Sequence, residues 1–209
     1  MSDEGVTPFR WWLECGAISP NILPRVPTPA SPVWEAHYSN DHEHGKRTSR
    51  RLEMFPFPVR QLFNKLRCGI SVQRWSDRLR VELEDDPTLH GGGIHVMAPG
   101  GWLATHLDYA RHPHYPDKER RLNLIAFLND EWFEEWGGAL IFCDPLGNVV
   151  RRIYPAPGRL VAFETGDDSY HGVEPVTGPM ERVTAAVYLL SDARPGVSRQ
   201  RALFMPKRT

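Results

Sequence analysis

Residues 121–128 read "RLNLIAFL", a run that is apolar at nearly every position. A strand covered on both faces of a sheet lacks the polar–apolar alternation of a half-exposed strand. The run is therefore typical of a central, fully buried strand. It predicts that the chain builds a sheet with a packed layer on each side.

Short apolar runs continue on both sides of this stretch, from residue 91 onward, and Gly and Pro separate them. They are "GGIHVMAPGG", "WLATHLD", "GGALIFCD", "NVVRRIYP", "GRLVAFET" and "RVTAAVYLLS". Seven or eight short strands joined by turn residues indicate a β-sandwich or barrel. We predict a mainly β fold with N-terminal helices, in which residues 91–192 form a double-stranded β-helix, a jelly-roll (cupin-like) barrel.

Two helices are predicted ahead of the strands, within a support layer at residues 56–90. "FPVRQLFNKLRCG" (57–69) and "SVQRWSDRLRVEL" (71–83) both carry apolar residues at helical spacing. Pro58 suits a first helical turn, and Ser71 is a candidate cap. We expect both helices to cover one outer face of the sheet.

The sequence predicts little regular structure toward the two ends of the chain. Residues 1–55 form an N-terminal extension with five prolines between residues 19 and 32, which favours extended chain, and with a polar loop at residues 37–51. Residues 193–209 form a C-terminal tail, of which the basic stretch from residue 199 is expected to fray.

Composition narrows the class of protein. The chain has 209 residues, of which 41% are hydrophobic and 24% charged, as expected for one globular domain. The net charge of −1 favours neither nucleic acid nor an anionic membrane as a partner. The arginine pairs at 50–51, 120–121 and 151–152 are interpreted as solvated surface, and the oligomeric state stays open.

The cysteines predict a compartment. Cys15, Cys68 and Cys143 are odd in number and far apart, which indicates reduced thiols rather than a disulfide framework. No apolar run is long enough to span a bilayer. We therefore expect a soluble, cytoplasmic protein.

The candidate chemistry lies in "ATHLDYARHPHY", residues 104–115. A His-x-Asp pair is weak evidence by itself, because about one His-x-acid pair is expected by chance in this composition. At the end of a strand, however, His106 and Asp108 point to the same side. His171, in "SYHGV", offers a third ligand. Two imidazoles and one carboxylate are the ligand set of non-haem Fe(II) oxygenases.

The last predicted strand carries a possible anion site. Arg182 and Thr184, in "ERVTAAVYL", again share one face of a strand. A guanidinium beside a hydroxyl can bind a carboxylate, and a buried arginine would be costly without such an anion. The alternative is an edge arginine that pairs with a surface acid.

Taken together, residues 91–191 resemble the 2-oxoglutarate- and Fe(II)-dependent dioxygenase superfamily, in its prolyl 4-hydroxylase-like branch. The motifs that carry the resemblance are "APGGWLATHLD", "RRLNLIAFLND", "EEWGGALIFCD", "PGRLVAFET", "HGVEPV" and "RVTAAVYL". They cover about half of the chain and occur in the expected order.

The resemblance implies a role for each site residue. His106, Asp108 and His171 would be the iron ligands and the catalytic centre, and Arg182, assisted by Thr184, would bind the distal carboxylate of 2-oxoglutarate. The chain departs from the family pattern at Met97 and Phe127. Neither side chain has the aromatic hydroxyl that related enzymes often carry near these positions. Asn123 shares strand parity with Phe127 and either replaces one lost hydrogen bond to the cosubstrate or bonds to backbone.

The implied activity is hydroxylation of an unactivated C–H bond, with succinate and CO2 as coproducts. The cofactors would be Fe(II), 2-oxoglutarate and O2, with ascorbate in a supporting role. The carboxylate of Asp108 argues against a halogenase. We favour a small-molecule or amino-acid-like substrate. A prolyl residue of a protein substrate and a non-catalytic metal-binding barrel are the alternatives.

The sequence leaves two alternative roles open for several other residues. The loop that follows Asp108 forms either a lid, with His112, His114 and Tyr115 on the substrate, or a solvated loop; we expect no iron contact from its histidines. His95 either lines the pocket or is a satisfied core histidine. Gly137 and Gly138 are expected to set a tight turn.

Overall fold

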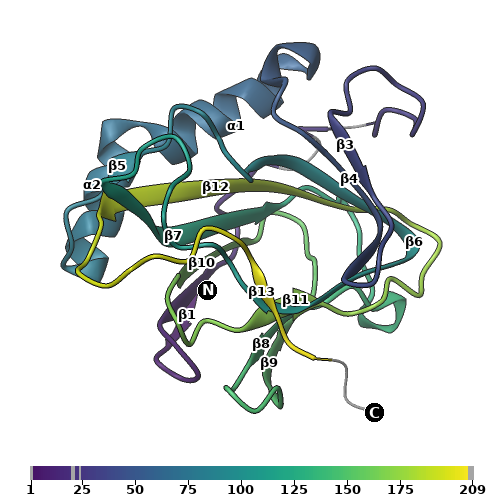
Figure 1. The fold of residues 1–209 in the computed structure, drawn as a ribbon. Helices are drawn as coiled ribbons and strands as arrows, with labels where there is room; N and C mark the ends of the chain where they lie inside the picture. Colours follow the sequence, from purple (N-terminus) through teal and green to yellow (C-terminus); the bar gives the residue numbers. More distant parts are fainter. Residues whose placement is uncertain (1, 20–21, 24, 207–209) are drawn as a thin grey trace.

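The computed structural model describes residues 2–19, 22–23 and 25–206. The chain folds as a mainly β structure in which one continuous antiparallel sheet curls on itself, with two helices on the outside (Figure 1). Its larger and smaller parts, which share one strand, are here called the large sheet and the small sheet. The prediction of a double-stranded β-helix with N-terminal helices is confirmed.

The large sheet has the strand order β1-β2-β10-β7-β12-β6. Its strands are β1 (Ser2–Gly5), β2 (Trp11–Glu14), β10 (Leu160–Glu164), β7 (Lys118–Phe127), β12 (Arg182–Asp192) and β6 (Gly93–Leu107). The apolar run at residues 121–128 lies mostly in β7, between β10 and β12, as predicted for a central strand.

The strand β6 belongs to both sheets. Its first part pairs with β12, and its last part pairs with β11 (His171–Val173) in the small sheet. The small sheet continues through β8 (Leu140–Cys143) to β9 (Val149–Ile153). The turn in β6 occurs near Gly100, whose positive φ of 80° suits a residue without a side chain. This bend carries the end of β6 from one sheet to the other.

The helices α1 (Phe57–Arg67) and α2 (Gly69–Leu79) lie over the outer face of the large sheet (Figure 1). Phe63 and Trp75 are fully buried there, in one apolar core with Leu122 and Leu124 of β7. Both predicted helices and the face that they cover are confirmed. The prediction of Ser71 as a cap was wrong, because α2 already begins at Gly69 and Ser71 lies inside it. Two short 3-10 turns are η1 (Leu52–Met54) and η2 (Glu134–Trp136), and β5 (Glu84–Asp85) pairs with β12.

The polar segment predicted as a loop contains a β-hairpin, so that prediction was wrong for most of its length. β3 (Ala36–Tyr38) pairs with β4 (Glu43–Ser49), and β4 extends the large sheet beyond β6. Its polar residues are stable there because they are partnered. The guanidinium of Arg47, which is 3% exposed, lies 2.8 Å from both carboxylate oxygens of Glu181 and over the ring of Trp34.

The predicted fraying of the C-terminal tail was also wrong for residues 199–206; residues 207–209 lie outside the described part of the chain. β13 (Leu203–Phe204) pairs with the end of β6. The Nε of Arg199 donates to the carbonyl of Asp108 at 2.8 Å, and the amide of Met205 donates to that of Thr105 at 2.9 Å. Across the described residues, no helix has the length and apolar character needed to cross a bilayer.

Candidate active site

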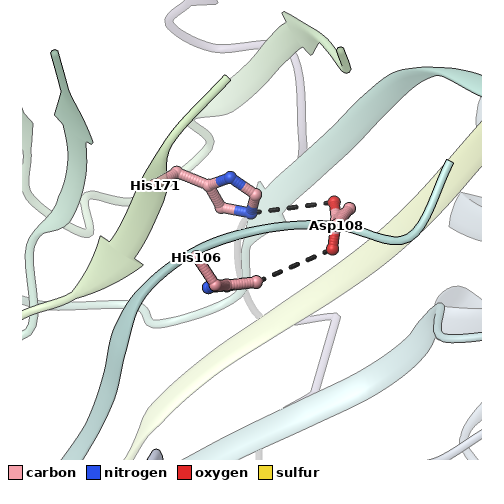
Figure 2. A group of neighbouring side chains, drawn as sticks. All are labelled: His106, Asp108 and His171. Carbon is pink, nitrogen blue, oxygen red and sulfur yellow. Dashed lines mark ion pairs between the residues drawn. The ribbon is translucent and has the colours of Figure 1, made fainter. Parts of the chain in front are cut away.

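Two histidines and one aspartate meet where the small sheet adjoins β6 (Figure 2). His106 and Asp108 come from the end of β6, and His171 begins β11 directly opposite His106. The Nε2 atoms of His106 and His171 each lie 3.7 Å from a different oxygen of Asp108. One ligand atom from each residue lies within 4.8 Å of the others. Strand parity and barrel closure thus bring together the three residues that the sequence singled out.

Backbone carbonyls fix the orientation of both imidazole rings. The Nδ1 of His106 donates to the carbonyl of Ala104 at 2.9 Å, and the Nδ1 of His171 donates to that of Ser169 at 2.8 Å. With the proton on Nδ1, each Nε2 has a free lone pair that faces Asp108. Burial lowers the pKa of His171 to about 4, and the neighbouring His106 adds to this. The three groups therefore form a preoriented site that fits a divalent metal ion.

The carboxylate of Asp108 is held from behind by a tyrosine and an arginine. The hydroxyl of Tyr188 donates to its Oδ2 at 3.0 Å, and the Nη1 of Arg120 lies 3.7 Å from its Oδ1. Burial raises the pKa of Asp108, but the imidazoles of His171 and His106 and the guanidinium of Arg120 outweigh burial, so the net shift is downward. The carboxylate stays charged throughout the physiological range.

The side chain of Arg120 is itself enclosed by two aromatic rings. Its guanidinium carbon lies 3.5 Å from the ring centroid of Tyr109 and 3.5 Å from that of Tyr188. It is 2% exposed, so the interpretation of the pair 120–121 as solvated surface was wrong for this residue. The sequence pattern does not indicate this buried position, because a β-bulge opposite Leu189 and Leu190 turns Arg120 to the inner face.

A cavity of about 630 Å³ opens beside the triad. It is lined by Arg182 and Thr184 and by polar side chains of the β3–β4 hairpin and of residues near His90. The polar lining residues outside the triad are Glu35, Tyr38, Glu43, Lys46, Thr48, Arg50, His90, His95, Tyr109, His114, Arg120, Asn123, Arg182, Thr184 and Tyr188. The lining of the cavity is thus strongly polar and includes a buried arginine.

The cavity is lined by a buried cation that has no carboxylate partner among the described residues. Arg182 is 4% exposed, and the hydrogen bond that the structure gives it runs from its Nε to the carbonyl of Gly138 at 2.8 Å. Burial lowers its pKa to about 10. Gly137 and Gly138 form the expected turn, with φ values of 64° and 66°. An unpaired buried guanidinium beside a cavity fits a ligand carboxylate.

The two departures from the family pattern lie on the inner face with Asn123. The ring of Phe127 lies under Arg182 at 5.1 Å, where it offers a π-face but no hydroxyl, and Met97 lines the cavity. Asn123 is 2% exposed, lines the same cavity, and has a buried Oδ1 without a hydrogen-bond partner. Its side chain therefore does not bond to backbone through this atom, which leaves Oδ1 free for a ligand.

Residues 92–190, just under half of the chain, match the family model of the 2OG-Fe(II) oxygenase superfamily. This part of the chain is a 2OG-Fe(II) oxygenase domain. Oxygenases of this family use Fe(II), 2-oxoglutarate and O2, and the donor set of the triad and the unpaired Arg182 fit the first two. No curated protein matches the chain by sequence.

The oxygenase has the fold of bacterial and animal prolyl hydroxylases. It is similar to a Pseudomonas putida prolyl-4-hydroxylase, with a TM-score of 0.58 and 20% identity over 76% of this chain and 77% of that one. It is also similar to a Trichoplax adhaerens prolyl hydroxylase, solved with a peptide of the hypoxia inducible factor oxygen degradation domain. There the TM-score is 0.51, with 17% identity over 76% of this chain and 70% of that one. At such identities the likeness concerns the fold.

The histidine-rich loop of the oxygenase is pinned by a buried pair. His112 is 1% exposed; its Nε2 lies 3.3 Å from Asp86, and its Nδ1 accepts from the amides of His114 and Tyr115 at 3.2 and 3.1 Å. His112 thus fixes the conformation of the loop, while His114 is exposed and lines the cavity. Of the candidate substrate contacts in this loop, His114 is the one that the structure places at the cavity.

His95 makes oxygenase stability depend on pH. It lines the cavity, and burial, with Lys46 as a second cause, lowers its pKa from 6.5 to about 3. The unfolded chain therefore binds a proton between these values that the folded protein does not. We expect the free energy of unfolding of the metal-free protein to fall as the pH drops below 6.5, by at most about 1.4 kcal/mol per pH unit from this residue.

Urea unfolding at about pH 7.5 and about pH 5 measures this dependence. His95→Asn removes the titrating group and should lose less stability between the two conditions than the wild type. An equal loss in both proteins would show that His95 is protonated in the folded state as readily as in the unfolded chain.

Proposed function

We propose that His106, Asp108 and His171 bind Fe(II), that Arg182 and Thr184 bind the distal carboxylate of 2-oxoglutarate, and that Asn123 contributes a further polar contact to the cosubstrate. The observation that carries this proposal is the unpaired guanidinium of Arg182 in the same cavity as the triad. Bound Fe(II) would couple the oxidative decarboxylation of 2-oxoglutarate to hydroxylation of a C–H bond.

The chain's own residues would orient and charge the site. The Nδ1–H bonds of the two histidines present both Nε2 lone pairs to the metal. Tyr188 and Arg120 hold the carboxylate of Asp108 in one rotamer and keep it ionised. The apolar cluster around Phe127, Phe142 and Phe163 fills the barrel behind the cavity and keeps water away from it.

For the substrate we propose a small molecule or an amino-acid-like compound. Oppositely charged pairs line the cavity: Lys46 with Glu43 at 2.8 Å, and Arg50 with Glu35 at 3.4 Å. Paired charges of both signs suit a polar substrate that carries a cationic and an anionic group. Hydroxylation of a prolyl residue in a protein is the second candidate, favoured by the prolyl hydroxylase fold.

Anaerobic titration of the purified protein with Fe(II) and 2-oxoglutarate tests the cofactor assignment. We expect the weak visible charge-transfer band of a chelated Fe(II)–2-oxoglutarate complex. A folded protein that gives no band would refute the assignment. Succinate release, measured with free amino acids and with proline-containing peptides in parallel, then separates the two substrate classes; ascorbate is included to keep the iron reduced.

Replacing Tyr188 by phenylalanine is expected to weaken Fe(II) binding by about tenfold, because groups that hold a metal ligand in place typically contribute 10- to 100-fold in affinity. The change removes the hydroxyl that donates to Asp108 and leaves the ring over Arg120. Anaerobic Fe(II) titration measures the effect. Tyr170→Phe, which alters a tyrosine away from the cavity lining, should bind Fe(II) as the wild type does.

The three thiols are consistent with a reducing compartment, and we propose a cytoplasmic location. Cys15, Cys68 and Cys143 are all unpaired, and Cys143 is buried.

A further inference from the structure

Residues 199–206, here called the C-terminal strap, are bound along the end of β6, which carries His106, and along the residues that follow it, beginning with Asp108. Phe204 of β13 pairs with His106, and Leu203 pairs with Leu107. Before β13, the carbonyl of Arg199 accepts from the amides of Ala110 and Arg111 at 2.8 and 3.0 Å. The strap is therefore fixed at both ends along the segment that runs from Thr105 to Arg111.

Within the strap, the side chain of Phe204 lies against the proposed metal site. Its ring stacks on that of His106, with the centroids 5.2 Å apart and the planes 30° apart. Phe204 lines the cavity and is half-buried, whereas Leu203 points outward and is 52% exposed. The alternation along β13 thus places one large aromatic ring at the cavity wall beside a metal ligand.

The opposite face of Phe204 contacts the β3–β4 hairpin. His42, in the turn of the hairpin, stacks on Phe204 with the centroids 4.2 Å apart and the planes 9° apart. The carbonyl of His42 also accepts from the amide of Ala104 at 2.8 Å. Phe204 therefore links three segments, namely the strap, the hairpin turn and the end of β6.

We propose that Phe204 is a specificity-determining residue, which limits the size of molecules that reach the metal on the side of His106. Its ring fills the space between strap and hairpin, and the stack on His42 holds it there. This inference rests on the proposed function, because it takes His106 to be a metal ligand. It accounts for a large side chain at the cavity wall in a strap that, among its described residues, otherwise contributes Ala202 to the lining.

A chelator can remove bound Fe(II) by two routes, and the proposed steric role of Phe204 determines which route is open. If the wall keeps a bulky chelator out, iron must leave before it is captured, and the rate does not depend on chelator concentration. If the wall is removed, the chelator attacks the bound metal directly, and the rate rises with its concentration. A small chelator is less sensitive to the wall than a large one.

The experiment loads the full chain with Fe(II) and 2-oxoglutarate under argon and mixes it with ferrozine, which is bulky, or with 2,2′-bipyridine, which is smaller. For the wild type we expect iron loss that is independent of ferrozine concentration. For Phe204→Ala we expect loss to ferrozine that is about tenfold faster and concentration-dependent, because the ring that keeps the chelator from the metal is removed. The acceleration with bipyridine should be smaller.

Leu203→Ala is the matched control, since it shortens the exposed neighbour on the same strand and should behave as the wild type. Phe204→Leu and His42→Ala should give intermediate rates, and they test the proposal even if Phe204→Ala fails to fold. Equal iron loss in wild type and all Phe204 variants, or equal acceleration with both chelators or in Leu203→Ala, would overturn the proposal. A wild type that does not bind Fe(II) would instead refute the proposed function.

Discussion

Replacing His106 by alanine is expected to abolish the Fe(II)–2-oxoglutarate charge-transfer band and to reduce 2-oxoglutarate-dependent succinate formation to background. The change removes one of three proposed ligands, and neither a further histidine nor a further acid completes the group among the described residues. Fe(II) bound by one imidazole and one carboxylate would be held too weakly to survive titration at micromolar protein. The charge-transfer band and succinate release are the two measurements.

His37→Ala serves as the control for this experiment. His37 lies on β3, is exposed, and is not part of the cavity lining. Its variant should give the wild-type band. A band of full intensity in His106→Ala would mean that the metal is bound elsewhere in the chain.

Replacing Arg182 by methionine is expected to weaken 2-oxoglutarate binding by about 100-fold, the equivalent of roughly 2.7 kcal/mol for a desolvated, charge-assisted carboxylate contact. The same change should leave the free energy of unfolding equal to or above that of the wild type. It replaces a buried cation, for which the described part of the chain offers no carboxylate partner, by an apolar side chain of similar length. Fe(II) binding without cosubstrate should be unchanged.

The dependence of the charge-transfer band on 2-oxoglutarate concentration measures the first effect, and urea unfolding measures the second. Arg152→Met is the matched control, because Arg152 pairs with Glu174 at 2.9 Å on the exposed side of the small sheet. It should bind 2-oxoglutarate normally. If Arg182→Met instead unfolds readily and retains its affinity, the arginine supports the fold and the cosubstrate carboxylate binds elsewhere.

The parts of the site that lie on regular strands could be predicted from sequence. The two-residue period places His106 with Asp108, and Arg182 with Thr184, on one face each, and the structure agrees. His171 follows from strand order, since barrel closure sets its distance from His106. These predictions worked because they depend on local geometry and on the order of strands, which the chain encodes directly.

The parts that break this period could not be predicted. Arg120 reaches the inner face through a β-bulge, and a register shift of one residue reverses which side chains point inward. Phe204 lies in a basic stretch whose charges suggest solvent, and its place depends on pairing with a strand about a hundred residues earlier. The β3–β4 hairpin was missed for a related reason, because its polar side chains find their partners only in the folded chain.

The pairings of β6 determine at which stage of folding the proposed metal site can form. It pairs with β4, β11, β12 and β13, which enter the sequence both long before and long after it. Such long-range pairings form late, after slow loop closure. His106 and His171 can therefore become neighbours only after β11 has been synthesised and has paired with β6, so the proposed iron site forms after this pairing rather than nucleating it.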